Sequence, residues 1–366
     1  MKKIRVLQIG LHTNRGGIET VVYSWWKNMP HDEVVFDFLN VWNEPIAYQD
    51  EFEAGGAKII YKSLRKDNPG KSYKELKKII TDGNYDFVHC HIMSLSEPEP
   101  VKITNIFSNA RVILHSHTIA TIDKMGFKRY LLHIYGKTIL KKYNYLKIAC
   151  GMEAGCTMFG VNNFTVIENG VDRNKFKYSI ENRLEIRNIY NISKNEFVIG
   201  HVGRPGKAKN YSFLIKTFSE FLKINNAKLL LIGDIKNDRN VQNLIDTFHI
   251  RNYVICTGKV KDVYKYYSAM DVFFFPSLYE GFSVSLVEAQ STGLPCIVSE
   301  NVDRQSAVSN ILTFIDINKT YEALRELGKC YKNRLADRNK VLFNEAYDVK
   351  QSSLKMLKYY RRNIIK

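Results

Sequence analysis

The 366-residue chain lacks several patterns by which other classes of protein are known. Its six cysteines contain no C-x-x-C pair, and most stand in apolar stretches typical of strands. We therefore expect buried free thiols rather than disulfides or a cysteine zinc site. The cysteines are Cys90, Cys150, Cys156, Cys256, Cys296 and Cys330.

Patterns of membrane-spanning and exported proteins are missing as well. No apolar run reaches the roughly 18–20 residues that a bilayer span needs. The N-terminal residues MKKIRVLQIG lead straight into a strand pattern without a signal-peptide cleavage site. No internal repeat or low-complexity stretch is present. The sequence therefore predicts a cytoplasmic protein.

Acidic residues are fewer than basic residues. Lys and Arg number 54 against 37 for Asp and Glu, which leaves a formal net charge of +17. Such an excess favours an anionic partner: nucleotide phosphates, an anionic membrane face or nucleic acid. With 45% hydrophobic and 25% charged residues, the composition is that of a globular protein, and the length allows two domains with a core each.

Short apolar strand patterns alternate with helical patterns along most of the chain. Strands are expected at 4–9, 34–39, 59–60, 86–91 and 111–117, and again at 197–202, 228–234, 254–258, 272–275 and 296–298, whereas 303–366 is expected to be helical. This alternation predicts an α/β fold of two Rossmann-like, doubly wound domains. The G-x-G-x-x-G spacing is missing after the first strand, which argues against a nicotinamide or flavin enzyme.

Glycine-rich turns follow the first strand of each half. The first turn ends in Gly16-Gly17 before a helix, which is the order of a phosphate-binding corner or of a tight structural turn. In the second turn, Arg204 and Lys209 follow Gly203, and an arginine fork and a lysine charge can converge on one pyrophosphate. Alternatively the second turn is only a basic surface. Lys207 could substitute in part for its neighbours.

The stretch 270–300 carries two carboxylates around a helix start. A strand and a Pro-Ser turn lead to Glu280-Gly281, a helix follows from about 282 to 291, and Glu288 lies about two turns into it. Gly281 allows close backbone approach, and the amides after it can hold an anion at the helix N-terminus. The two carboxylates would suit sugar hydroxyls. The alternative is an exposed loop glutamate beside an ordinary amphipathic helix.

Four histidines stand in two H-x-H patterns at strand ends: His89, His91, His115 and His117. Ligands bind at the carboxyl ends of parallel strands, so these side chains are candidates for a site. Such patterns can also bind zinc. We do not favour zinc here because no carboxylate-rich or cysteine partner accompanies the histidines.

Residues 124–147 combine seven Lys or Arg with aromatic and aliphatic residues and contain no Asp or Glu. A basic amphipathic helix of this kind can lie on an anionic membrane surface. The alternative is a solvated helix whose apolar stripe packs on its own sheet.

In their order, these motifs closely resemble the retaining family 4 glycosyltransferases, and most of all those of capsular and exopolysaccharide assembly. The resemblance covers roughly residues 4–300 and rests on the Pro-Ser, Glu-Gly-Phe and Gly-x-Pro order of 270–300 and on the Gly-Arg and Lys-Asn pairs of 203–210. It implies the GT-B fold, in which two Rossmann-like domains face each other across a cleft. The segment after Ser299 matches only loosely, and sugar choice depends partly on such loops.

The resemblance implies a role for each matching residue. Glu280 would contact the transferred sugar, Glu288 the nucleotide ribose, and Arg204 and Lys209 the donor diphosphate. The histidine near the transferred sugar aligns with His117, and we expect His115 on the opposite face of its strand. The other implied donor-binding positions are Gly16, Gly17, Gly203, Gly281, Phe282 and Ser283.

The resemblance also divides the chain. An Asn-Gly-Val-Asp turn would be the hinge, so residues 1–171 would form the acceptor-binding domain and 172–345 the nucleotide-sugar domain. Residues 346–366 would be a helix that crosses back to the first domain. No D-x-D motif occurs in the chain. We therefore expect neither metal nor cofactor, the nucleotide sugar being a substrate.

The leading hypothesis is a retaining glycosyltransferase that moves a hexosyl or N-acetylhexosaminyl group from a nucleotide diphosphate donor, a UDP-sugar, to a lipid-linked glycan. It would work at the inner face of the cell membrane, held there peripherally by the basic segment. A GT-B sugar-nucleotide epimerase is one alternative. A basic nucleic-acid-binding protein is the other, but no helix-turn-helix, zinc-finger or RNP-type pattern supports it, and we expect no nucleic-acid partner.

Overall fold

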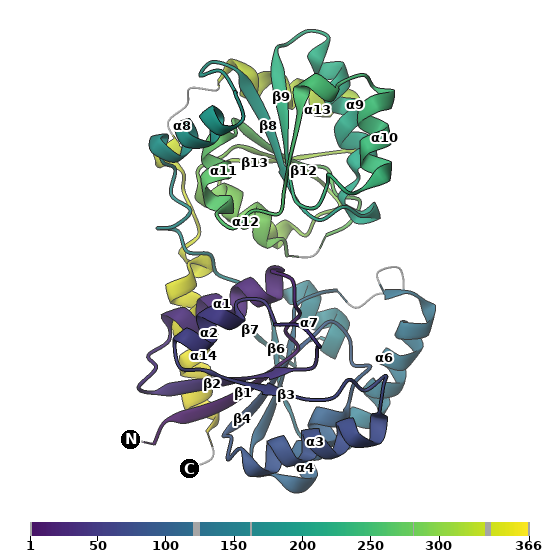
Figure 1. Cartoon of the computed structure of the whole chain (residues 1–366), viewed down its shortest axis with the longest axis vertical. Coiled ribbons are helices and arrows are strands. Elements are labelled where there is room, and N and C mark those ends of the chain that lie inside the picture. The colour runs from purple at the N-terminus through teal and green to yellow at the C-terminus, as the bar shows by residue number, and fades with distance from the viewer. Residues whose placement is uncertain (1, 120–124, 162, 281, 334–337, 365–366) are drawn as a thin grey trace. The chain divides into compact units, whose positions relative to one another are not determined.

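In the computed structural model, residues 2–119, 125–161, 163–280, 282–333 and 338–364 are described. They form two compact units (Figure 1): unit 1 consists of Met1–Gly170 and Ala346–Lys366, and unit 2 of Val171–Glu345. The boundaries predicted from the sequence lie after Val171 and before residue 346. Each unit is a parallel sheet covered by helices, the α/β architecture that the sequence predicted.

Unit 1 contains a seven-stranded parallel sheet in the order β3-β2-β1-β4-β5-β6-β7. Its inner strands are mostly buried, because helices cover both faces of a parallel sheet, whereas the two edge strands are partly exposed. The strands are β1 (Ile4–Ile9), β2 (Val34–Asn40), β3 (Lys58–Tyr61), β4 (Phe87–Ile92), β5 (Arg111–Ser116), β6 (Leu146–Ala149) and β7 (Thr165–Val166). The helices are α1 (Gly17–Asn28), α2 (Gln49–Ala54), α3 (Pro69–Asp82), α4 (Glu99–Phe107), α6 (Phe127–Leu140), α7 (Met152–Phe159) and α14 (Val349–Asn363).

The last helix, α14, is a member of unit 1 although it comes after the whole of unit 2 in the chain. It packs beside α1 (Figure 1). The buried Trp25 indole of α1 donates a hydrogen bond of 2.8 Å to Ser352 Oγ, and Tyr360 is fully buried under the sheet strands. The C-terminal helix is therefore part of the core of unit 1.

Unit 2 contains a six-stranded parallel sheet in the order β10-β9-β8-β11-β12-β13. Its strands are β8 (Phe197–Val202), β9 (Ala227–Ile232), β10 (Val254–Gly258), β11 (Val272–Phe275), β12 (Cys296–Ser299) and β13 (Leu312–Ile315). Its helices are α8 (Ile180–Ile189), α9 (Tyr211–Leu222), α10 (Arg239–Thr247), α11 (Val263–Ala269), α12 (Val284–Ser291) and α13 (Thr320–Lys332). The expectation that 303–366 is wholly helical was wrong, because β13 pairs with β12 at the sheet edge. Unlike the wholly buried β11 and β12, β13 is only partly buried and Thr313 interrupts its apolar residues, so it does not form a continuous apolar run.

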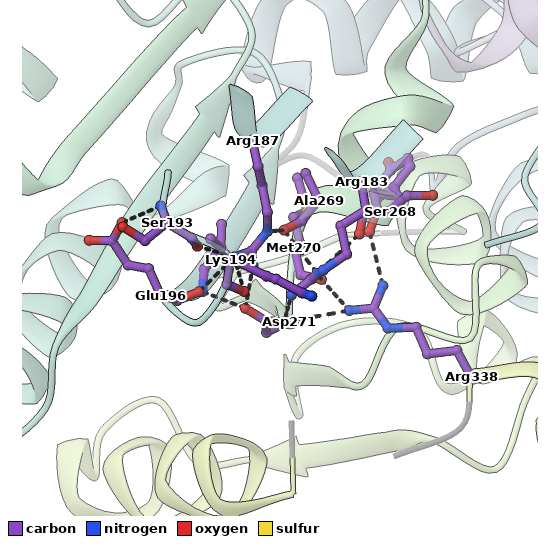
Figure 2. A network of polar contacts seen from close by, with 12 residues as sticks. Arg183, Arg187, Ser193, Lys194, Glu196, Ser268, Ala269, Met270, Asp271 and Arg338 are labelled. Atoms are coloured by element: carbon purple, nitrogen blue, oxygen red, sulfur yellow. Dashed lines mark hydrogen bonds and ion pairs between the residues drawn. The ribbon is translucent and has the colours of Figure 1, made fainter. Parts of the chain in front are cut away.

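A buried carboxylate joins three segments of unit 2 (Figure 2). Asp271, just before β11, accepts hydrogen bonds of 2.7 Å from Arg183 and 2.8 Å from Arg187, both on α8. Arg338 lies 4.0 Å from the same carboxylate and donates to the carbonyl oxygens of Tyr267 and Met270. These carbonyls satisfy guanidinium groups that one carboxylate alone would leave short of acceptors. Helix α8, at the beginning of unit 2, is thus bonded to the start of β11.

Candidate functional site

The turn after β8 and the turn after β11 meet through an ion pair. Lys209 Nζ lies 2.5 Å from Glu280 Oε2 and 4.4 Å from the centre of the Phe275 ring. Both charged side chains are mostly shielded from solvent. A backbone hydrogen bond of 2.8 Å from Leu278 N to Ala208 O holds the two turns together. The structure therefore places a cation and a carboxylate together at the carboxyl ends of adjacent parallel strands.

The two other basic residues of the β8 turn are oriented differently. Arg204 and Lys207 are exposed, and within the described residues Arg204 makes no hydrogen bond or ion pair. Lys209 is the last residue of a 3-10 turn, and Asn210 after it caps α9 with its side chain from the left-handed region, φ 53°. Of the predicted diphosphate clamp, Lys209 is thus held in place, whereas the Arg204 guanidinium extends into solvent.

Two side chains pack closely against the glycine at the start of this turn. A Cβ atom on Gly203 would lie 3.2 Å from both His201 Nε2 and Lys209 Cε. The buried His201 ring lies with Nδ1 2.9 Å from the carbonyl of Phe274, and burial lowers its pKa to about 3. His201 is therefore a neutral ring behind the turn that carries Lys209.

The second glutamate is buried within unit 2. Glu288 lies on α12 and is 8% exposed, and its Oε2 accepts a hydrogen bond of 3.0 Å from the Tyr267 hydroxyl. Burial raises the pKa of Glu288 to about 7, against the opposing effects of the Tyr267 hydrogen bond and of the Lys175 charge. Glu288 therefore changes protonation state near neutral pH, while Glu280 is paired with Lys209. The two carboxylates differ in both partner and burial.

The predicted anion seat at the start of α12 lies partly outside the described residues. Gly281 lies outside the described residues, and Phe282 is half-buried. Ser283 is buried at the N-cap position, and its amide donates a hydrogen bond of 3.2 Å to Ser306 Oγ. The helix begins at Val284, two residues later than predicted. The Ser306 hydroxyl thus accepts the hydrogen bond of an amide that was predicted to face a phosphate.

In unit 1, the glycine turn after β1 is closed by a buried acid. Glu19 on α1 accepts hydrogen bonds of 3.0 Å from the amides of His12 and Gly16. Gly16 is the N-cap residue and Gly17 the first residue of α1. Gly10 has φ +110°, and a Cβ there would lie 2.3 Å from the His91 carbonyl oxygen. This turn is therefore rigid and lies tightly against the end of β4.

The histidines at the ends of β4 and β5 lie together. His115 is completely buried and stacks on Trp25, whereas His117, the first residue after β5, is half-buried. The rings of His115 and His117 stack with centroids 4.1 Å apart. The expectation that these two rings lie on opposite faces was wrong, since residues two apart along a strand point the same way. Among the described residues, His89, His91 and His115 have one nitrogen each within 4.8 Å of one another.

Three residues that contact predicted site residues or turns were not predicted from the sequence. Tyr267 binds Glu288 from 21 positions away, and no motif signals such a pair. His201 precedes the β8 turn, and only its place in the strand could have singled it out. Glu19 could have been found, because a glutamate three residues after a helix N-cap is a known capping pattern.

Basic side chains and exposed apolar side chains share α6, the helix of the acid-free segment. Lys128, Arg129, Lys141 and Lys142 are exposed, the last two just after the helix. Five large apolar side chains on α6 are exposed as well: Phe127, Leu131, Leu132, Ile134 and Tyr135, with exposed fractions of 67%, 52%, 47%, 43% and 64%. Lys124 lies outside the described residues. In the described part of the chain, no helix has the length and apolar character to cross a membrane.

Comparisons with known proteins support one family. The family described as glycosyl transferases group 1 matches residues 182–313. A putative glycosyltransferase of Bacillus subtilis, EpsF, is 31% identical over 317 residues, 81% of this chain and 79% of its own length. The UDP-Gal:alpha-D-GlcNAc-diphosphoundecaprenol alpha-1,3-galactosyltransferase of Escherichia coli is 25% identical over 84% of this chain and 82% of its own length.

A solved structure shows the same arrangement of elements. The crystal structure of Anabaena Alr3699/HepE in complex with UDP and glucose matches with a TM-score of 0.80 at 16% identity. It covers 98% of this chain and 99% of its own length. The fold of this chain is therefore that of GT-B proteins, each with two Rossmann-like domains.

Proposed function

Because the chain belongs to the group 1 glycosyl transferases, we propose that it moves a sugar from a UDP-sugar to a hydroxyl of a lipid-linked glycan during polysaccharide synthesis. The observation that carries this proposal is the ion pair of Lys209 with Glu280, 2.5 Å apart at the strand ends of unit 2. A cation for a departing diphosphate and a carboxylate for sugar hydroxyls are needed side by side in such a reaction. UDP as the nucleotide is supported by the name of the E. coli relative and by the UDP bound to HepE.

The donor diphosphate is the group that Lys209 and Arg204 serve. Lys209 is already held by its turn, and the exposed Arg204 fork is free of described partners and can close on phosphate oxygens. Gly203, with the backbone of the same turn, completes the proposed seat within unit 2. These groups stabilise the charge that develops as the diphosphate leaves, which removes the need for a metal ion.

The two glutamates take different parts of the donor. Glu280 accepts hydrogen bonds from hydroxyls of the transferred sugar, with Lys209 as a shared neighbour. Glu288 accepts hydrogen bonds from the ribose hydroxyls, and Tyr267 orients its carboxylate. Because the pKa of Glu288 lies at about 7, the carboxylate form that accepts two hydroxyls is fully populated only above neutral pH.

The proposed reaction retains the anomeric configuration. The bond from the anomeric carbon to the diphosphate oxygen breaks, and the acceptor hydroxyl oxygen forms the new bond on the same face. The departing phosphate oxygen takes the acceptor proton, so no enzyme base is required. An α-linked donor then yields an α-linked product. His117 lies at the transferred sugar in this proposal.

The membrane is the proposed location of the acceptor. Helix α6 exposes large apolar side chains, which a surface helix of a globular protein normally turns toward the core. Exposed lysine and arginine side chains lie among them. Apolar insertion and attraction to anionic headgroups act together in peripheral helices. We infer that α6 lies on the anionic inner face of the cell membrane, where a polyprenyl diphosphate-linked glycan is found.

Product analysis tests the proposed function. Purified protein is incubated with a UDP-sugar panel and a short lipid-linked saccharide, and the products are identified by mass spectrometry. Extension of the saccharide by one sugar, with release of UDP, is expected. A free epimerised UDP-sugar would instead identify an epimerase, and neither product together with RNA binding would identify a nucleic-acid-binding protein.

A further inference from the structure

The four histidines of unit 1 form one hydrogen-bonded chain with Gln8 and Tyr360, which we call the histidine chain. On one side, His117 Nε2 lies 2.9 Å from His91 Nδ1, and His91 Nε2 lies 2.8 Å from Gln8 Oε1. On the other side, the Tyr360 hydroxyl lies 3.4 Å from Gln8 Nε2 and 2.7 Å from His89 Nδ1. His89 Nε2 then lies 3.2 Å from His115 Nδ1. The histidine chain thus begins at His117, just after β5, and passes through β4, β1 and α14. It then returns through His89 on β4 to His115 on β5.

Each ring of the histidine chain is neutral and carries one proton. Burial holds the pKa of all four imidazoles well below its usual range. A contact between two neutral rings needs an N–H on one side and a lone pair on the other. Tyr360 has one hydroxyl proton, and only one end of the Gln8 amide can donate. The direction of each hydrogen bond in the histidine chain therefore depends on the direction of the others.

Two settings satisfy every contact of the histidine chain and also use the Tyr360 hydroxyl proton within it. If the Tyr360 hydroxyl donates to His89, Gln8 must donate to Tyr360 and accept from His91, and all four rings carry their proton on Nε2. If Tyr360 donates to Gln8, the amide must turn over, and all four rings carry their proton on Nδ1. One hydroxyl proton therefore sets the tautomer of rings on two strands.

The distances favour the first setting. A separation of 2.7 Å between Tyr360 and His89 is typical of an O–H donor, whereas 3.4 Å between Tyr360 and Gln8 is too long for one. In the first setting the long contact is a weak N–H donation from the amide. His117 then donates from Nε2 to His91, and its Nδ1 keeps a lone pair.

We propose that Gln8 and Tyr360 are positioning residues that hold His117 in the Nε2-protonated tautomer, so that Nδ1 faces the transferred sugar as a hydrogen-bond acceptor. This inference rests on the proposed function, which places His117 at the sugar. Its own support is that His117 Nδ1 is buried and has no hydrogen-bond partner among the described residues. A sugar hydroxyl would supply the missing donor. In the other setting the same atom would be an unpaired donor. His115 Nε2, which also lacks a partner among the described residues, is a donor in the first setting and an acceptor in the second, so the contact distances decide between the two.

Two histidines outside the chain provide internal references. His133 Nδ1 lies 3.1 Å from the amide of Leu95, which can only donate, so His133 carries its proton on Nε2. His201 Nδ1 lies 2.9 Å from the Phe274 carbonyl, which can only accept, so His201 carries its proton on Nδ1. Both tautomers are therefore known independently of Gln8 and Tyr360.

The test is long-range ¹H–¹⁵N NMR of the full chain labelled with ¹⁵N-histidine, at pH 7.5. Pyrrole-type and pyridine-type nitrogens have distinct shifts, and each ring is assigned by its own His→Gln variant. Rings 89, 91, 115 and 117 are expected to match His133 and to differ from His201. Protonation of His117 on Nδ1, or of any of the four rings on both nitrogens, would overturn the proposal.

Two variants break the chain at its centre. Gln8→Met removes the amide without changing the length of the side chain, and Tyr360→Phe removes the hydroxyl that orients the amide. Each should give His117 a mixed tautomer while the His133 and His201 signals stay in place, which also reports that the protein is folded. Ser353→Ala is the matched control on α14, because the Ser353 hydroxyl is buried without a partner among the described residues. Unchanged His117 signals in both Gln8→Met and Tyr360→Phe would mean that the two residues only pack the core.

Activity separates this inference from the proposed function. A tautomer populated for half of the time halves the fraction of molecules that can accept the sugar hydroxyl, so kcat/KM for the UDP-sugar should fall roughly twofold in both variants. A changed tautomer with unchanged kcat/KM would leave Gln8 and Tyr360 as the residues that set the tautomer but would remove His117 from the sugar site. Lost activity with an unchanged tautomer would overturn the inference.

Discussion

The ammonium group of Lys209 and the carboxylate of Glu280 lie 2.5 Å apart, although 71 positions separate them in the sequence. Two βα turns of one sheet bring them together, and each neutralises the other while the diphosphate is absent. Substitution of one partner therefore leaves the other charge uncompensated in a partly buried position. The pair is the part of the proposed donor site for which the structure gives the most direct geometry.

Lys209→Ala should lower kcat by about two orders of magnitude or more, because one oriented donor to a developing oxyanion contributes about 3–4 kcal/mol in comparable sites. Arg204→Ala should have a similar effect. Lys207→Ala is the matched control: Lys207 is exposed in the same turn and should cost far less. Steady-state kinetics with the UDP-sugar measure all three. Equal losses in the three variants would show that only the overall charge of the turn matters.

Substitution of Glu280 and substitution of Glu288 should affect different steps. Glu280→Ala should mainly lower kcat, since Glu280 is proposed to bind the transferred sugar. Glu288→Ala should mainly weaken UDP binding, by roughly 10- to 100-fold for the loss of hydrogen bonds to a charged group. Calorimetry with UDP and kinetics with the UDP-sugar measure the two effects. Tight UDP binding by Glu288→Ala would exclude the ribose as its ligand.

UDP affinity should also depend on pH through Glu288. The pKa of this carboxyl lies at about 7 in the free protein, because burial disfavours its charged form. Below pH 7 the group is mostly protonated, so affinity should rise between pH 6 and pH 8 in the wild type. Glu288→Gln, which has no proton to lose, should show a flatter profile over the same range. Parallel profiles for the two proteins would assign the pH dependence to another group.

Transfer should not require a metal ion, since Arg204, Lys209 and backbone amides are proposed to offset the diphosphate charge. Activity should therefore survive excess EDTA after dialysis. Abolition of activity by EDTA with rescue by Mn²⁺ would contradict this prediction. Lys209→Ala provides a further check, because added Mn²⁺ should not restore it.

Binding to anionic liposomes should depend on both classes of side chain on α6. Reversal of Lys128, Arg129, Lys141 and Lys142 to Glu should abolish binding, at about 1 kcal/mol for each charge near the surface. At high salt, the apolar contribution to liposome binding should remain. A triple variant should weaken this contribution: Phe127→Ser, Leu131→Ser and Tyr135→Ser. Sedimentation with anionic and neutral liposomes measures both effects.

The control for this experiment reverses four other exposed basic residues of unit 1: Lys66, Lys71, Lys74 and Lys78. That variant should bind as the wild type does. Equal binding of the wild type to both liposome types would mean that α6 is a solvated helix. Self-association of the protein, lost in the apolar variant, would mean that a second copy covers α6 instead.

Stability should fall as the pH falls below about 6.5. Burial lowers the folded-state pKa of five histidines, to about 3 for His89, His117 and His201 and well below normal for His91 and His115. The unfolded chain therefore binds more protons between pH 6.5 and about 3, so the contribution is complete above pH 6.5 and is lost below it. Each group contributes up to about 1.4 kcal/mol per pH unit.

Glu288 acts in the opposite direction, since its folded-state pKa is raised, but it is one group against these five histidines and His133, whose pKa burial also lowers. The urea midpoint at pH 5.0 should therefore lie clearly below that at pH 7.5. Equal midpoints would mean that the buried histidines are charged in the folded protein or become accessible to water.

The sequence predicted the two sheets well because parallel strands buried on both faces are continuous apolar runs. The positions of Lys209, Glu280 and Glu288 in turns and at a helix start followed from local patterns. Contacts between distant segments did not. Tyr267 beside Glu288 and Tyr360 beside His89 depend on how α11 and α14 pack, and no spacing in the chain encodes such pairs.

The measurement that tests the central claim most directly is NMR of the product formed from an α-linked UDP-sugar and a lipid-linked saccharide acceptor. The account predicts an acceptor that carries one additional sugar in α linkage, formed in EDTA by the wild type and at least a hundredfold more slowly by Lys209→Ala. A β-linked product, or a free altered UDP-sugar with the acceptor unchanged, would contradict it.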